Sequence, residues 1–132
     1  MRALFDTNIL VDYLNGVGRA RDEIHRHEER SVSIVSWMEV LVGAEKEDEE
    51  ASIRDFLAGF QVLDVDRDTA EEAVRLRRGQ RIRLPDAIIW ATARVAGALL
   101  VTRNTKDFPS DDPGVRVPYS LARPRSTKSR SR

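Results

Sequence analysis

The sequence predicts an α/β protein, built as a three-layer α/β/α sandwich around a mostly parallel sheet of four or five strands. Two observations support this prediction. Short β-rich apolar segments alternate along the chain with helical segments, and parallel neighbouring strands need helical crossovers of this kind. The chain has 132 residues, a length that suits one domain. We expect a folded domain over residues 1–120 and a tail over residues 121–132.

The N-terminal half is predicted to contain two strands and four helices. Strands are indicated by short runs of apolar and β-branched residues, and helices by apolar residues that recur every three or four positions. Gly16 and Gly59 mark helix ends. The stretch from Ser36 to Glu39 matches a capping box, in which Glu39 would accept from the Ser36 amide. The predicted elements are strands at residues 2–5 and 31–35 and helices at residues 7–15, at 19–29, from 36 onward and around 53–57.

The C-terminal half repeats this alternation. Gly79 and Gly97 are predicted to end its two helices, and Pro85 suits the first turn of the second. The predicted elements are strands at residues 61–65, 98–102 and 115–117, helices at 68–78 and 85–96, and a basic link at 80–83.

The balanced charge of the chain hides an uneven distribution. There are 22 basic and 22 acidic residues, but the tail contains basic residues and no acid. These are Arg123, Arg125, Lys128, Arg130 and Arg132. The rest of the chain therefore has 17 basic residues against 22 acidic ones. Such a tail is typical of disorder, and it also fits a contact with RNA phosphates.

Composition excludes several classes of site. Because the chain has no cysteine, disulfides, thiolate catalysis and cysteine-based zinc sites are excluded. His25 and His27 lie two positions apart on a predicted helix and therefore point in different directions, so we expect both at the surface. Because Met1 directly precedes the first predicted strand, we expect no leader peptide, and no apolar run has the length of a membrane span. We expect a cytoplasmic protein that does not bind membranes.

Acidic residues follow several of the apolar runs. Asp6 comes directly after a predicted strand, Glu39 and Asp86 lie near predicted helix starts, and Asn104 and Asp107 follow the strand at residues 98–102. In open parallel sheets, ligands bind beyond the carboxyl ends of the strands. Carboxylates gathered there repel one another unless a cation or protons intervene, and hard cations such as Mg²⁺ and Mn²⁺ prefer such oxygen ligands. The pattern favours a divalent-metal site.

Each acid also fits a purely structural role. Asp6 suits a helix N-cap, Glu39 a capping box, Asp86 the positive end of a helix dipole and Asp107 a turn. These roles explain the acids singly, but they do not explain why all of them lie at one edge of the sheet.

Four motifs, in this order, resemble the PIN domain and in particular the VapC ribonuclease toxins of bacterial and archaeal toxin-antitoxin pairs. The motifs are Leu4-Phe5-Asp6-Thr7-Asn8, then Glu39 near a helix start, then Leu84-Pro85-Asp86-Ala87-Ile88-Ile89-Trp90-Ala91-Thr92-Ala93, then Leu100-Val101-Thr102-Arg103-Asn104-Thr105-Lys106-Asp107-Phe108. The resemblance extends to about Tyr119. It implies an endoribonuclease that depends on Mg²⁺ or Mn²⁺, has an α/β/α fold and acts as the toxin of a VapBC-type pair.

The resemblance also implies roles for individual residues. Asp6, Glu39 and Asp86 match the three family acids, and either Asn104 or Asp107 takes the fourth place, so all five are candidate metal ligands and the four acids are candidate catalytic groups. Three polar residues fall on supporting positions that orient the ligands: Thr7, Asn8 and Thr102. Three arginines are candidates for contact with RNA phosphates: Arg81, Arg83 and Arg103.

The implied partners are an RNA substrate, with tRNA among the candidates, a cognate VapB-type antitoxin and a second copy of the chain in a homodimer. DNA would be met only through the antitoxin. Two alternatives stay open at this point. One is a PIN-like RNA-binding or scaffold domain without catalysis, although all three core acids are present. The other is a phosphatase of the haloacid dehalogenase type, which needs an acid at the position of Asn8.

Overall fold

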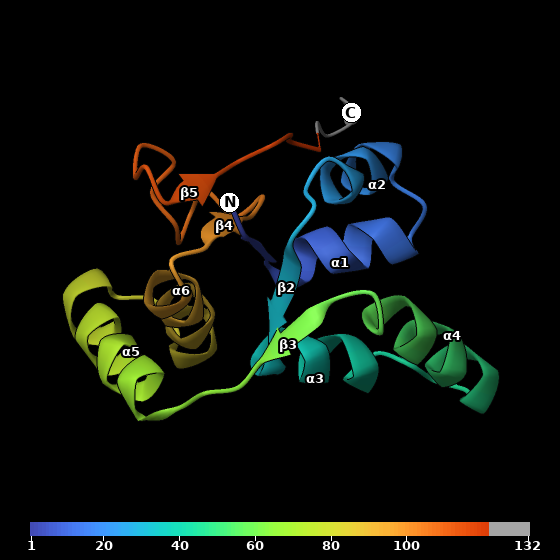
Figure 1. Cartoon of the computed structure of the whole chain (residues 1–132), viewed down its shortest axis with the longest axis horizontal. Coiled ribbons are helices and arrows are strands. Elements are labelled where there is room, and N and C mark those ends of the chain that lie inside the picture. The colour runs from blue at the N-terminus through green and yellow to red at the C-terminus, as the bar shows by residue number, and fades with distance from the viewer. Residues whose placement is uncertain (122–132) are drawn as a thin grey trace, which may run out of the picture.

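The structure is a computed structural model that describes residues 1–121, and it contains a five-stranded sheet (Figure 1). The strand order is β3-β2-β1-β4-β5, and every neighbouring pair is parallel. The strands are β1 (Ala3–Phe5), β2 (Arg30–Ser33), β3 (Gln61–Leu63), β4 (Leu99–Val101) and β5 (Val115–Arg116). The helices are α1 (Thr7–Leu14), α2 (Gly18–His25), α3 (Ile34–Val42), α4 (Glu47–Leu57), α5 (Arg67–Gln80) and α6 (Leu84–Ala96).

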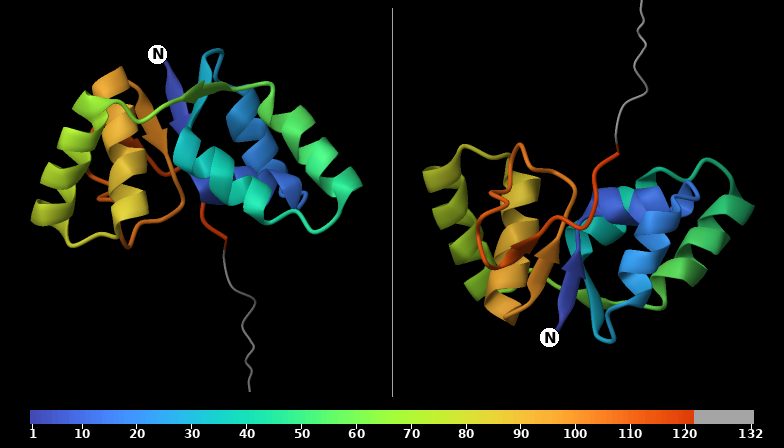
Figure 2. Two further views of the ribbon diagram at one scale, coloured as in Figure 1. Left: turned by 90° about the horizontal axis from the view of Figure 1, so that it is seen from below. Right: turned by 90° about the horizontal axis from the view of Figure 1, so that it is seen from above.

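The sheet separates two hydrophobic cores. Leu4 and Leu100 of the central strands pack in the core formed with α5 and α6, whereas Phe5 and Val101 pack in the core formed with α1, α2 and α4. This is the alternation of side chains that a strand imposes. Figures 1 and 2 show α5 and α6 on one side of the strands and α1, α2 and α4 on the other. The predicted α/β/α sandwich is therefore confirmed.

The order in which the chain adds strands to the sheet reverses at β1, although all strands remain parallel. The chain runs from β1 outward through β2 to β3, and then returns to place β4 on the other side of β1. The ends of β1 and β4 are in register, with Phe5 opposite Val101, and the Asp6 amide donates to the Val101 carbonyl. Ligands bind at such switch points. The register therefore places Asp6 and Thr102 side by side at the edge where a site is expected.

Two predicted boundaries were wrong. The helix predicted from Ser36 begins earlier, at Ile34, because the extended Ser33 is its N-cap and accepts the Val35 amide at 3.1 Å. The helix predicted to close at Gly79 continues to Gln80, and Arg81 ends it in the left-handed conformation, with φ 53°.

The remaining predicted elements are confirmed, with two larger shifts: the helix predicted at residues 19–29 ends at His25, and the helix predicted around residues 53–57 already begins at Glu47. Within residues 1–121, no helix is both long enough and apolar enough to cross a membrane. The predicted tail lies outside the described residues, apart from Leu121.

Candidate active site

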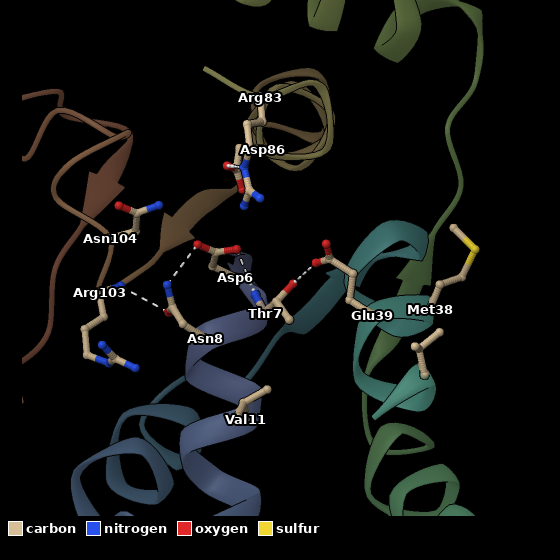
Figure 3. Close-up of a pocket in the computed structure, with 11 residues that line it drawn as sticks. Asp6, Thr7, Asn8, Val11, Met38, Glu39, Arg83, Asp86, Arg103 and Asn104 are labelled. Carbon is tan, nitrogen blue, oxygen red and sulfur yellow. Dashed lines mark hydrogen bonds and ion pairs between the residues drawn. The ribbon is translucent and has the colours of Figure 1, made fainter. Parts of the chain in front are cut away.

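Polar residues from separate segments line a pocket of about 550 Å³ at the switch point (Figure 3). The predicted residues Asp6, Glu39, Asp86 and Asn104 all line it, and Asp107 does not. The other lining residues are Thr7, Asn8, Val11, Met38, Val42, Arg83 and Arg103. Sequence reasoning missed the apolar members. A signal was present, because Val11 follows Thr7 by four positions and Val42 follows Glu39 by three, which places each pair on one helix face.

Asp6 is the most enclosed acid of the pocket, with 4% of its surface exposed. One carboxylate oxygen accepts the Thr7 amide at 2.8 Å, and the other accepts the Thr102 hydroxyl at 2.7 Å and the Asn8 side-chain amide at 3.2 Å. Asp6 thus caps α1, as its structural role predicted. Among the described residues, none of its hydrogen-bond donors carries a charge.

Burial raises the pKa of Asp6 to about 6. The hydrogen bonds from Thr102 and the Thr7 amide act in the opposite direction, and the nearby charges of Asp86 and Glu39 raise the pKa further. Asp6 is therefore a carboxylate whose charge the described residues leave largely uncompensated.

Glu39 reaches the pocket from the second turn of α3. The Thr7 hydroxyl donates to its Oε1 at 2.6 Å and lies 2.8 Å from the Ser36 hydroxyl. The predicted capping box was wrong. Ser36 is a buried residue within α3 and not its N-cap, and Glu39 accepts a hydrogen bond from Thr7 of α1 instead. This contact across two helices points Glu39 toward Asp6 (Figure 3).

Asp86 lies in the first turn of α6 and is buried. Burial raises its pKa, Arg83 lowers it in part, and the charges of Asp107 and Glu39 raise it again. The Arg83 contact is long, at 3.4 Å, and the Arg83 side chain is 79% exposed. Asp86 therefore has a weakly held cation at its side.

Asn104 and Asp107 are joined in a hydrogen-bonded turn, and the charge of Asp107 acts on Asp86. The Asn104 amide donates to Asp107 Oδ2 at 3.0 Å, and its carbonyl oxygen accepts the backbone amides of Lys106 and Asp107 at 3.2 Å. The oxygen that Asn104 could offer to a metal is thus already engaged. The structure brings Asn104 to the pocket and keeps Asp107 directly behind it.

Arg103 lines the pocket, but its guanidinium is turned to Asp12. It donates to both Asp12 oxygens, at 2.7 and 2.9 Å, and Tyr119 donates to one of them at 2.8 Å. The Arg103 amide donates to Asn8, so this cluster supports the residue that bonds to Asp6. The predicted RNA contact of Arg103 stays a prediction, with its cation already paired.

A second buried acid, Glu23, has the same kind of partner. Arg116 donates to both of its oxygens, at 2.6 and 3.0 Å, and His27 Nε2 lies 2.8 Å away. The surface position predicted for His25 is confirmed. The same prediction was wrong for His27, which is partly buried because its ring packs edge-on against Phe5 and bonds to Glu23. No role was predicted for Asp12 or Glu23 from the sequence.

The donor set of the pocket suits a hard cation, because it combines carboxylates with amide and hydroxyl oxygens. Among residues 1–121, however, no three His, Cys, Asp or Glu side chains are gathered closely enough to hold a metal ion. The carboxylates of Asp6, Glu39 and Asp86 share a pocket without yet forming a ligand cluster.

Comparison with known proteins gives matches over most of the chain. A family model for the PIN domain matches residues 3–110. The tRNA(fMet)-specific endonuclease VapC of Shigella flexneri is 29% identical over 119 residues, which are 82% of this chain and 90% of that protein. Ribonuclease VapC10 of Mycobacterium tuberculosis is 34% identical over 114 residues, or 80% of this chain and 85% of that one.

Solved structures match in fold. A toxin-antitoxin complex from Klebsiella pneumoniae contains a chain that is 43% identical, with a TM-score of 0.85 and coverage of 90% of this chain and 99% of that chain. A DNA-bound VapBC from Salmonella typhimurium is 25% identical, with a TM-score of 0.74 and coverage of 88% and 96%.

Proposed function

The chain belongs to the PIN-domain family, and we propose that it is an endoribonuclease that depends on Mg²⁺ or Mn²⁺ and acts as the VapC-type toxin of a toxin-antitoxin pair. The observation that carries this proposal is the buried carboxylate of Asp6, which shares the pocket with Asp86 and Glu39 and accepts hydrogen bonds from uncharged donors only. A buried carboxylate without a cation is costly. A divalent cation bound from the pocket would offset that cost.

Asp6 and Asp86 are the proposed direct ligands of the cation, and Glu39 is the third acid of the site. When bound, the cation would lower the pKa of a water molecule and offset the charge on the phosphate. The chain's own residues do the positioning. The Thr7 hydroxyl orients Glu39 by donating a hydrogen bond to it. Thr102 and Asn8 orient Asp6, because both donate hydrogen bonds to its Oδ2. One of the acids would accept the proton of the attacking water.

The fourth position of the site is assigned to the turn of Asn104 and Asp107. The side-chain carbonyl oxygen of Asn104 accepts hydrogen bonds from two backbone amides. We therefore propose that Asn104 orients Asp107 and does not bind the cation directly. Asp107 would then contribute negative charge near Asp86.

The names of the relatives suggest the substrate and the partner. Since the Shigella relative is called a tRNA(fMet)-specific endonuclease, we propose RNA as the substrate, with tRNA as the first candidate to test. Since the Klebsiella and Salmonella structures are a toxin-antitoxin complex and a DNA-bound VapBC, we propose a VapB-type antitoxin as the partner, with DNA bound through it. A homodimer and a cytoplasmic location complete the proposal.

A cleavage assay with a matched acid control tests this function. The full chain is incubated with end-labelled single-stranded RNA and with tRNA, in Mg²⁺ or Mn²⁺ and then with chelator. We expect cleavage that the chelator abolishes and that Asp86→Asn reduces by about a hundredfold or more. Asp55→Asn removes an exposed acid of α4 outside the pocket and should leave the rate unchanged. Cleavage that survives both chelation and Asp86→Asn would falsify the metal-dependent mechanism.

The cleavage assay tests one alternative function, and the residue at position 8 bears on the other. A PIN-like domain without catalysis would bind RNA and leave it intact under every metal condition. A phosphatase of the haloacid dehalogenase type would need an acid where Asn8 stands, and the Asn8 amide is bonded to Asp6. The structure therefore supports the nuclease over the phosphatase.

A further inference from the structure

We infer that the arginines at the end of α5 and in the link to α6 form a phosphate-binding surface along which single-stranded RNA reaches the pocket. This surface, the arginine rim, consists of Arg77, Arg78, Arg81 and Arg83. The inference rests on the proposed ribonuclease function and deepens it, because it names the side from which the substrate enters.

The rim is a dense block of positive charge. Residues 73–85 include five arginines and no acid. Arg83, at the pocket end, lines the pocket and contacts Asp86. Arg77, Arg78 and Arg81 are exposed, and none of them forms an ion pair with a described residue. Their charges are therefore available to a polyanion, and clustered arginines of this kind release counterions from phosphates.

The helix dipole of α5 accounts for only some of the arginines in the rim. Arg77 and Arg78 lie in the last turn of α5, where the partial negative charge of the carbonyls stabilises cations. Arg81 lies beyond that turn in the left-handed conformation, with φ 53° and ψ 35°. It is the only non-glycine residue with positive φ in the described chain. Glycine is the usual residue in this conformation, and strain of this kind is often found at functional sites.

The opposite side of the pocket has the opposite charge. Residues 45–50 contain five acids and one lysine. A neighbouring hollow between α1, α3 and α4 shares Val11 and Glu39 with the pocket and includes Glu49 of that acidic segment. A polyanion is repelled from this side and attracted to the rim. The charges flanking the pocket thus assign one direction of approach to RNA.

The experiment measures RNA affinity across a range of salt concentrations. A labelled 20-nucleotide single-stranded RNA is titrated with the full chain carrying Asp6→Asn, which prevents cleavage during binding. To this background we add the triple change Arg77→Gln, Arg78→Gln and Arg81→Gln. The control adds Arg21→Gln, Arg54→Gln and Arg67→Gln, which remove the same charge from exposed positions elsewhere.

We expect the rim variant to bind on the order of tenfold more weakly at low salt and to lose about 2 from the slope of log K against log salt, at roughly 0.7 per phosphate contact. The control variant should keep the slope of the background protein. Arg81→Gly alone should weaken binding while the melting temperature stays equal or rises, since glycine removes the strained conformation.

Three results would overturn the rim. These are an equal loss in both triple variants, no loss in the rim variant while the background protein binds RNA, or a larger loss for duplex DNA than for RNA. If the unsubstituted chain cleaves RNA and the rim variant binds normally, only the rim is wrong. If the unsubstituted chain neither binds nor cleaves RNA, the proposed function fails and the rim fails with it.

Discussion

Two of the four buried acids in the described chain form two-point ion pairs with arginine, and the other two do not. Asp12 and Glu23 each accept two hydrogen bonds from one guanidinium, from Arg103 and Arg116 respectively. Asp6 has neutral donors, and Asp86 has one long contact with an exposed arginine. All four are buried to a similar degree, so burial alone does not separate them. What separates the two pairs is how well a neighbouring arginine compensates the charge of the carboxylate.

We propose that this difference separates the acids that stabilise the fold from those that act in the pocket. Asp12 and Glu23 lie on α1 and α2 and bind arginines of the C-terminal part, so they hold residues 103–119 against these helices. Their charge is already neutralised, and a bound cation would gain little there. Asp6 and Asp86 keep a charge that the fold leaves largely unpaired, at the edge of the sheet where a ligand can reach it.

The sharpest test of this comparison is a matched pair of substitutions, Asp6→Asn and Asp12→Asn. Both residues are 4% exposed, and the same atom changes in each. We expect Asp6→Asn to reduce the cleavage rate by about a hundredfold or more. The free energy of unfolding should stay unchanged or rise, because Asn also caps helices. We expect Asp12→Asn to lower the free energy of unfolding by about 3 kcal/mol, because it leaves Arg103 unpaired.

Urea unfolding at pH 7.5 and initial cleavage rates, measured on the same preparations, give both values. The proposed division between the two acids is wrong if Asp12→Asn removes cleavage while the free energy of unfolding is retained. It is also wrong if Asp6→Asn is the less stable of the two variants.

The sequence was sufficient to predict the two acids that we propose as metal ligands, but not the two that are paired with arginine. Asp6 and Asp86 were predicted from their positions after a strand and at a helix start, which are local features. The ion pairs of Asp12 and Glu23 join residues 91 and 93 positions apart, and no local pattern encodes such a pairing. One signal was present for Asp12, because it follows Ile9 by three positions and therefore lies on the buried face of α1.

The capping-box error has a similar origin. Ser33 and Ser36 are both serines near the start of a helix, and the β-branched Ile34 and Val35 between them favour a strand by propensity. Packing overrides that propensity, because Val35 packs against the core formed with α5 and α6. As a result the helix begins at Ile34, and Ser36 and Glu39 both become available to Thr7.

The pH dependence of stability should differ in sign between the two kinds of acid. The pKa of Asp6 is raised by burial to about 6, so the folded state binds the proton more tightly than the unfolded state. Asp6 therefore makes the protein less stable as pH rises from about 4 to 6. Burial acts to raise the pKa of Glu23, but the hydrogen bonds from Arg116 and His27 outweigh it and lower the pKa. Glu23 therefore makes the protein less stable as pH falls below its unfolded pKa.

Unfolding free energies from pH 3.5 to 7 for the parent, Asp6→Asn and Glu23→Gln check these signs. Relative to the parent, Asp6→Asn should remove a downward slope of roughly 1 kcal/mol per pH unit between pH 4 and 6. Glu23→Gln should be least destabilising at the acid end. Mn²⁺ at pH 7 should raise the stability of the parent by mass action and leave Asp6→Asn unaffected. Identical profiles for the two variants would show that the four acids form one class.

The smallest expected effect comes from Tyr119→Phe, which removes one donor from Asp12 and retains the ring. Burial and the hydrogen bond to Asp12 raise the pKa of Tyr119, so the phenol stays protonated and donates to the carboxylate at every pH of interest. Because Arg103 still neutralises Asp12, the loss should be about 1 kcal/mol of unfolding free energy, with kcat/KM for RNA unchanged.

Tyr13→Phe is the matched control, since that ring stacks on Phe56 and its hydroxyl forms no hydrogen bond with a described residue; we expect no measurable change. If Tyr119→Phe instead reduces kcat/KM about tenfold at full stability, the Asp12 cluster acts through Asn8 on Asp6. Asp12 would then be a positioning residue of the active site, and neutralisation by arginine would no longer mark an acid as purely structural.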